Sequence, residues 1–198
     1  MPVATIKLRH DPPLGQGSKI VEADETYFGN VPESKRLAKT TKGRPFTKGG
    51  RSGPSGKRAI IALVERGGDV RTFHVAVATR AAVEEIIKQN VSREARLHTD
   101  ESRLYSRIGD HVGLHESVKH SAGEYVRDDV HTNSAEGYFS IFKRGMRGVY
   151  QHCAEKNLHR YLAEYKFRYN TRHITDGERV ALAICGGDGK RLTYRQLH

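Results

Sequence analysis

The segment that most constrains the fold is RAIIALVE, at residues 58–65. Six consecutive apolar residues between charged ends are typical of a short strand that is buried on both faces. The four residues RGGD follow as a turn, and VRTFHVAVA, at residues 70–78, alternates well enough to form a second strand. The two segments together predict a β-hairpin at the centre of the protein.

Further elements are predicted on both sides of this hairpin. KIVEADETYFG, at residues 19–29, is a first strand, and Thr79 can cap a helix that buries Val83, Ile86 and Ile87. A short strand at 95–99 then places Asp100 at its C-terminal end. Three strands, a helix and a strand indicate an α/β fold, with the first three strands antiparallel and the fourth reached by a helical crossover. This order predicts a ribonuclease H-like mixed sheet with flanking helices.

The rest of the chain is predicted to be mainly helical. After an extended piece at 116–120, a helix should begin at Asn133 and run to about residue 144. A longer helix follows, with an apolar stripe at helical spacing made by Leu158, Tyr161, Leu162, Tyr165 and Tyr169. With 198 residues, we expect a leader at 1–17 and one domain at 18–198, whose helical part starts at about 133. The tail from residue 176 gives no clear pattern.

Charge indicates the class of partner. Lys and Arg total 34 against 23 acids, which gives a formal net charge of +11 and points to nucleic acid. Residues 30–57 are rich in Gly, Ser, Pro and basic residues, which predicts a flexible basic loop. Its phosphate-binding candidates are Lys35, Arg36, Lys39, Lys42 and Arg44.

No run of 18 apolar residues or signal peptide is found, so we expect a cytoplasmic protein without a membrane partner.

Three acids occupy places that this fold could bring together. Asp24 lies in the first strand, Asp100 ends the fourth, and Glu136 lies in the first turn of the following helix. Converging carboxylates repel one another, and divalent cations that prefer oxygen ligands relieve that repulsion. Two such ions about 3.5–4 Å apart can promote phosphodiester chemistry without a side-chain nucleophile.

Four segments carry a resemblance to a known family: VEADETYFG, LHTDES, HTNSAEGYFSIFKRG and NLHRYLAEYKFRYNTR. In this order they resemble the DDE-superfamily transposases of bacterial insertion sequences, in particular the group with an ISXO-like transposase domain. The resemblance implies a bacterial enzyme that uses Mg²⁺ or Mn²⁺, with two ions expected. It would cut transposon ends, join the freed 3′-hydroxyls to target DNA, and act as a dimer or higher multimer on DNA. By motif, Asp24 matches the first acid, Asp100 the second, and Lys143 a basic residue that contacts DNA.

The third member of the acidic set is open between two residues of HTNSAEG. Relatives use either an asparagine or a glutamate, which match Asn133 and Glu136. The two residues also have the spacing of a capping box, with Asn133 as the N-cap. We favour Glu136 as the metal ligand and Asn133 as the cap that orients it. Lys143 shares a helix face with Glu136, and phosphate contacts are expected from Lys143, Arg144 and Arg147.

Two other functions remain open. A decayed element could keep the fold as a nucleic-acid-binding protein without catalysis, although a pure binder has no need for three acids amid basic residues. A nuclease of the same fold would share the site and form a different product. Full-length relatives generally carry an N-terminal zinc-ribbon or helix-turn-helix segment, whereas this chain begins almost at its first catalytic strand. We therefore expect either end recognition by another region or a truncated copy.

Overall fold

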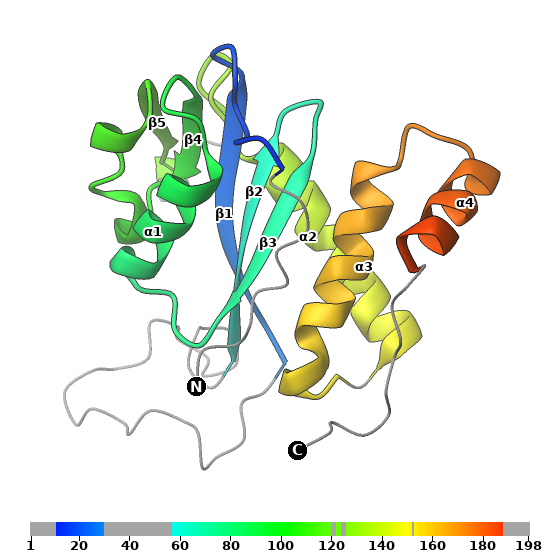
Figure 1. The fold of residues 1–198 in the computed structure, drawn as a ribbon. Helices are drawn as coiled ribbons and strands as arrows, with labels where there is room; N and C mark the ends of the chain where they lie inside the picture. Colours follow the sequence, from blue (N-terminus) through cyan, green and yellow to red (C-terminus); the bar gives the residue numbers. More distant parts are fainter. Residues whose placement is uncertain (1–10, 30–56, 120–121, 124–125, 152, 188–198) are drawn as a thin grey trace, which may run out of the picture.

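The described residues form a central five-stranded mixed sheet in the order β3-β2-β1-β4-β5 (Figure 1). The computed structural model describes residues 11–29, 57–119, 122–123, 126–151 and 153–187. β1 pairs with β2, and β2 with β3, in antiparallel register, whereas β1 and β4, and β4 and β5, run parallel. The strands are β1 Ile20–Phe28, β2 Arg58–Glu65, β3 Val70–Val75, β4 Arg96–Asp100 and β5 Leu114–Val118.

This topology is ribonuclease H-like, as predicted from the order of the elements. The hairpin and the helical crossover to β4 are confirmed, although β3 ends at Val75 rather than at residue 78. The extended piece predicted at 116–120 is instead Leu114–Val118, which continues the sheet beside β4.

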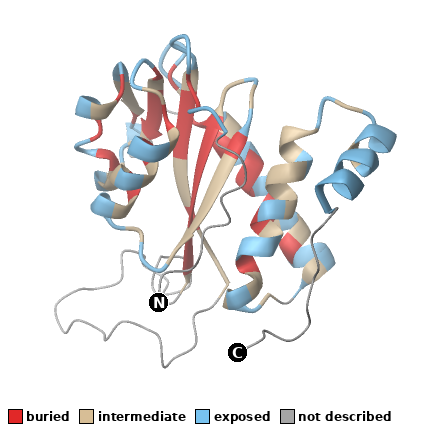
Figure 2. Cartoon of the chain, in the orientation of Figure 1, coloured by how far each residue is buried: buried red, intermediate tan, exposed pale blue. Residues whose placement is uncertain are grey.

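Helices cover both faces of the sheet. Helix α1, Arg80–Asn90, covers one face and begins as predicted at Thr79, whose side chain accepts a hydrogen bond from the Ala82 amide at 3.2 Å. Helices α2, Asn133–Gly145, and α3, Leu158–Asn170, cover the other. The β2 strand lies between the layers and is buried almost throughout, since Ile61 and Leu63 face α1 while its alternate residues face α2 and α3 (Figure 2).

Helix α2 is fixed against α3 by aromatic packing. The rings of Phe142 and Tyr165 meet edge to face with centroids 5.2 Å apart. Gly145 is the last residue of α2 and lies against Tyr165, so a side chain at this position would overlap the Tyr165 hydroxyl. Tyr138, Phe142 and Met146 are all buried and form the inward-facing stripe of α2. The helix therefore presents its other face to the cleft described below.

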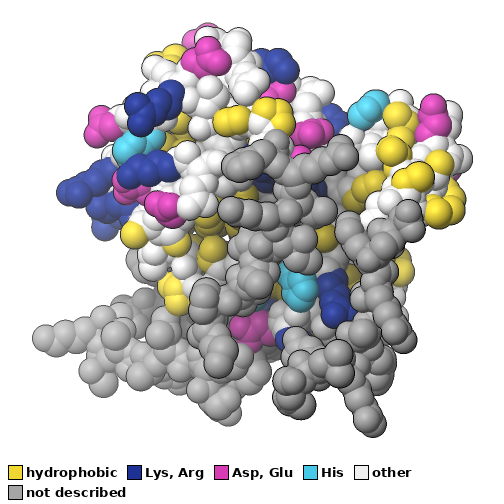
Figure 3. Space-filling model, viewed as in Figure 1, with side chains coloured by type: hydrophobic (Ala, Val, Ile, Leu, Met, Phe, Trp, Pro, Cys, Tyr) yellow, Lys and Arg dark blue, Asp and Glu magenta, His cyan; other side chains and the backbone are white. Residues whose placement is uncertain are grey.

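The chain continues into a further helix, in the tail where the sequence gives no clear pattern. Helix α4, Asp176–Gly187, follows a capping box in which Glu178 accepts hydrogen bonds from the amide and hydroxyl of Thr175, at 2.9 and 2.8 Å. No described residue of α4 is buried, and apolar side chains gather over it in Figure 3. The exposed ones include Val180, Leu182 and Ile184.

The predicted leader is described only from residue 11 onward. Leu14 is buried in the core, and its amide donates to the Asn90 carbonyl at the end of α1, at 2.8 Å. The described part of the segment 1–17 thus packs on the domain. Among the described residues, none of the helices has the length and apolar character required to cross a bilayer. Most of the predicted basic loop, residues 30–56, lies outside the described part of the chain.

Candidate active site

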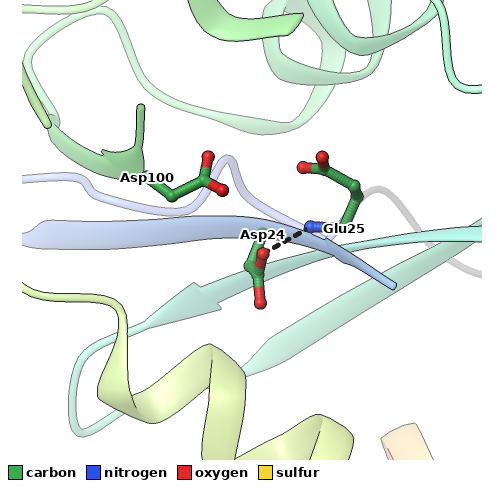
Figure 4. A group of neighbouring side chains, drawn as sticks. All are labelled: Asp24, Glu25 and Asp100. Carbon is green, nitrogen blue, oxygen red and sulfur yellow. Dashed lines mark hydrogen bonds between the residues drawn. The ribbon is translucent and has the colours of Figure 1, made fainter. Parts of the chain in front are cut away.

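Parallel pairing of β1 and β4 brings two of the predicted acids together. Ala23 pairs with Thr99, so Asp24 and Asp100 are the next residues of neighbouring strands. Asp24, Glu25 and Asp100 each offer one carboxylate oxygen, and these three oxygens lie within 4.8 Å of one another (Figure 4). These three residues are called the acidic cluster below.

Glu25 is a member of this cluster that was not predicted from the sequence. Its carboxylate accepts hydrogen bonds from the hydroxyls of Ser102, at 3.2 Å, and Tyr105, at 2.9 Å. Tyr105 is buried in the core beneath α1, so Glu25 leaves β1 on the α1 side. The sequence feature that could have predicted this contact is the polar pair Glu101 and Ser102 after Asp100. The loop that follows β4 passes close to the end of β1, where Ser102 meets Glu25.

Burial and mutual repulsion both disfavour the ionised forms of Asp24 and Glu25. Burial, followed by the charges of Glu25, Asp100 and Glu136, raises the pKa of Asp24 to about 8. Burial, followed by the charge of Asp100, also raises the pKa of Glu25. A cation placed among these oxygens would favour their ionised forms.

Helix α2 supplies the other wall of a cleft above Asp24. The cleft has a volume of about 360 Å³ and is lined by Asp24, Glu25, Thr26, Glu136, Phe139, Ser140 and Lys143. Glu136, Ser140 and Lys143 follow one another at helical spacing, so the predicted shared face of Glu136 and Lys143 is confirmed. Glu136 accepts a hydrogen bond from the Thr132 hydroxyl at 3.1 Å and is not one of the three acids within 4.8 Å.

The predicted cap at Asn133 is wrong. The N-cap residue of α2 is Thr132, so Asn133 is the first residue of the helix, and its spacing to Glu136 forms no capping box. Asn133 is exposed and is not among the residues that line the cleft. The amides of Ser134 and Ala135 instead donate to Glu22 of β1, at 2.7 and 3.2 Å. The hydrogen bonds to Glu22, from a distant part of the chain, therefore stand where a local cap at Asn133 was predicted.

Basic residues continue the cleft along α2. A second hollow is lined by Ser140, Lys143, Arg144, Arg147 and Gly148, and it shares Ser140 and Lys143 with the acidic cleft. Burial lowers the pKa of Lys143, while the charge of Asp24 acts in the opposite direction. The five loop residues predicted to contact phosphate, Lys35, Arg36, Lys39, Lys42 and Arg44, lie outside the described residues.

Comparison with known proteins identifies the family. Residues 16–170 match the ISXO2-like transposase domain, and this span includes β1 to β5 and helices α1 to α3. The chain belongs to this family. The resemblance found in the four sequence motifs is thereby confirmed.

A relative and a solved structure extend the comparison. This ISXO2-like domain is 27% identical over 154 residues to an uncharacterized protein in transposable element ISH50 of Halobacterium salinarum. The match covers 75% of this chain and 51% of that protein, so the chain spans about half the length of this relative. Because the relative comes from an archaeon, the bacterial origin expected from the motifs is not established.

One structural match is a chain of a simian T-cell lymphotropic virus intasome in complex with PP2A regulatory subunit B56 gamma. It has a TM-score of 0.39 at 13% identity and covers 95% of this chain and 57% of the matched chain.

The residues of this ISXO2-like domain fit a hard divalent cation. Asp24, Glu25 and Asp100 offer carboxylate oxygens alone, the donor type that Mg²⁺ and Mn²⁺ prefer. Burial and the neighbouring carboxylates raise the pKa of Asp24, and a cation among these oxygens would favour its ionised form. The donor set and its electrostatics therefore agree with the metal use that the family implies.

Proposed function

We propose that this ISXO2-like domain is the catalytic core of a DNA transposase, which cleaves strands at the ends of an insertion sequence and joins the freed 3′-hydroxyls to target DNA. The observation that carries the proposal is the acidic cluster of Asp24, Glu25 and Asp100 at one end of a cleft whose other wall becomes basic. A phosphodiester backbone bound along the basic wall would reach the carboxylates at its far end.

In this proposal Asp24, Asp100 and Glu136 hold Mg²⁺ or Mn²⁺, with two ions expected. When bound, the ions supply activation of the attacking oxygen and stabilisation of the leaving oxygen. Asp24 and Asp100 fix the site on the rigid sheet, while Glu136 adds a carboxylate from the facing helix. Asn133 remains the alternative third member, although it is exposed and lies outside the cleft lining.

DNA would be held by the basic wall of the groove. Lys143 lies nearest the acids and would contact the phosphate beside the scissile bond, because it lines both hollows. Arg144 and Arg147 would hold the strand farther along α2, and the basic residues of 30–57 would add contacts to the backbone. We propose that two or more subunits assemble on the paired transposon ends with target DNA.

A plasmid assay tests the proposal. The purified chain is incubated with its element's end DNA, a supercoiled target and Mg²⁺ or Mn²⁺, and the products are followed as nicks, linear ends and joined strands. Joined strands that disappear with chelator and with Asp100→Asn support a transposase. Cleavage without joining would indicate a nuclease, and DNA binding without either product would indicate a binding protein.

A further inference from the structure

We propose that Glu22 is a positioning residue, which sets where α2 presents Glu136 across the cleft from Asp24. Glu22 lines no part of the cleft, and its side chain is fully buried. The inference rests on the proposed function, because it requires Glu136 to act as a metal ligand.

Glu22 lies in β1, yet it accepts the hydrogen bonds that a capping residue would accept at the start of α2. One oxygen, Oε2, accepts from the amides of Ser134 at 2.7 Å and Ala135 at 3.2 Å. The other, Oε1, accepts from the Ser134 hydroxyl at 3.0 Å. These amides belong to the first turn, where helix donors have no partner within the helix and where negative charge is favoured. Thr132, the N-cap residue, makes no such bond and donates its hydroxyl to Glu136 instead.

Arg66 also holds the Glu22 carboxylate in place. The Arg66 guanidinium donates to Oε1 from Nε at 3.0 Å, and its Nη2 lies 2.9 Å from the same oxygen. His131 Nδ1 lies 3.3 Å from Oε1, but it accepts from the Asn133 amide at 3.4 Å and faces Arg66 Nη2 at 3.2 Å, so it is not a donor to Glu22. A buried carboxylate with several donors is fixed in position, because moving it away from Arg66 and the α2 amides would leave a buried charge without partners. The start of α2 is therefore attached to β1 at a defined point.

This attachment lies beside the acid that Glu136 must meet. Side chains on a strand alternate, so Glu22 and Asp24 project from the same face of β1, separated by about 6–7 Å of strand. Glu136 follows directly after Ser134 and Ala135, whose amides Glu22 holds. One strand thus carries both Asp24 and the group that determines the position of Glu136. A shift or rotation of the first turn of α2 would move Glu136 relative to the acidic cluster.

A double-mutant cycle on Mn²⁺ binding tests this role in the full chain. The Mn²⁺ dissociation constant is measured by electron paramagnetic resonance for the natural protein, Glu22→Gln, Glu136→Gln and the double variant. We expect Glu136→Gln to weaken binding about tenfold or more, and Glu22→Gln to weaken it several-fold. In the double variant, Glu22→Gln should add less than about twofold, since there is no longer a ligand to misplace.

The outcomes separate this inference from the proposed function. If Glu136→Gln binds Mn²⁺ as tightly as the natural protein, Glu136 is not a ligand, and both the assignment and the inference fall. If Glu136→Gln weakens binding but Glu22→Gln does not, only the inference is overturned. Equal losses from Glu22→Gln in both backgrounds would also overturn it, because they would show a general effect on the sheet.

Two further variants control for folding. Thr79→Ala removes the cap of α1 on the opposite face of the sheet and should lower the melting temperature without changing Mn²⁺ affinity. Ser134→Ala removes only the hydroxyl bond to Glu22 and is the substitute if Glu22→Gln does not fold. It should weaken Mn²⁺ binding about two- to threefold in the natural background and not at all beside Glu136→Gln. An unchanged affinity in Ser134→Ala, with Glu22→Gln unfolded, would count against the inference.

Discussion

Asp24 and Glu25 are adjacent in β1 and leave the strand toward opposite sides, yet an oxygen of each lies within 4.8 Å of the other and of Asp100 (Figure 4). Asp24 faces the cleft beneath α2, whereas Glu25 is held by hydroxyls on the α1 side. Asp100, at the end of the neighbouring strand, lies within reach of both.

Loss of either sheet aspartate should abolish cleavage and leave the fold intact. Asp24→Asn and Asp100→Asn keep the side-chain shape but remove a charged oxygen ligand, so the divalent cation should bind more weakly. Nicking of end DNA and circular dichroism measure the two properties. A folded Asp100→Asn protein that cuts DNA at the natural rate would refute the assignment.

Metal affinity should depend on pH through Asp24. Its pKa of about 8 in the metal-free protein means that an ion must displace a proton at neutral pH. The apparent Mn²⁺ affinity should therefore rise about tenfold per pH unit below 8 and level off above it. Calorimetry in buffers of different ionisation enthalpy counts the released proton. A pH-independent affinity between 6 and 8 would contradict the pKa.

Glu25→Gln distinguishes a ligand from a neighbouring charge. Because the charge of Glu25 raises the pKa of Asp24, its removal should move the pH midpoint for Mn²⁺ binding downward. If Glu25 acts only through this charge, the affinity at pH 9 should equal that of the natural protein. A weaker affinity at pH 9 would mean that Glu25 itself holds the ion.

Stability of the metal-free protein should fall as pH rises. The folded-state pKa of Asp24 lies above its ordinary value of 3.8, so the native state retains a proton that the unfolded chain releases. The stability linked to this proton is fully present below about pH 4 and is lost as pH rises to about 8. Asp24→Asn should therefore be more stable than the natural protein by about 1–3 kcal/mol at pH 8 and near equal at pH 4. Urea denaturation at the two pH values measures the difference.

Glu136→Gln and Asn133→Ala should behave differently. Glu136→Gln should retain stability within about 1 kcal/mol and lose nearly all metal-dependent cleavage. Asn133 is exposed and does not cap α2, so Asn133→Ala should change stability by no more than about 0.5 kcal/mol and retain activity. If Asn133→Ala is inactive while Glu136→Gln still cuts, asparagine is the ligand.

Basic residues should determine the salt dependence of DNA binding. If the loop makes about six phosphate contacts, affinity should fall about a thousandfold between about 50 and 200 mM salt. Replacement by Gln of Lys35, Arg36, Lys39, Lys42 and Arg44 should flatten that slope, as should Arg144→Gln with Arg147→Gln to a smaller extent. Lys88→Gln, on α1 away from the groove, is the matched control. An unchanged slope in the loop variant would exclude its phosphate contacts.

Local sequence patterns predicted the sheet well, because strand burial and alternation are properties of neighbouring residues. The same patterns placed Asp24 and Asp100 at strand positions that pairing then brought together. They failed at Asn133, since the donors at the start of α2 are satisfied by Glu22, more than a hundred residues earlier in the chain. A contact between distant segments leaves no trace in local spacing. The Thr175–Glu178 box of α4 is, by contrast, a local pattern from which the start of that helix could have been predicted.

Because α2 is attached to β1 through Glu22, an error in the register of β1 would also disrupt the candidate active site. A slip of one residue in β1 would exchange the faces of the strand, so that Glu22 would leave the helix and Asp24 would leave the cleft together. It would also bury a charge on the apolar side beneath α1, which is too costly to persist. Chains with an incorrect register should therefore fail to fold rather than accumulate as soluble protein without the site. In a preparation of this protein, the folded fraction should equal the fraction with an assembled site.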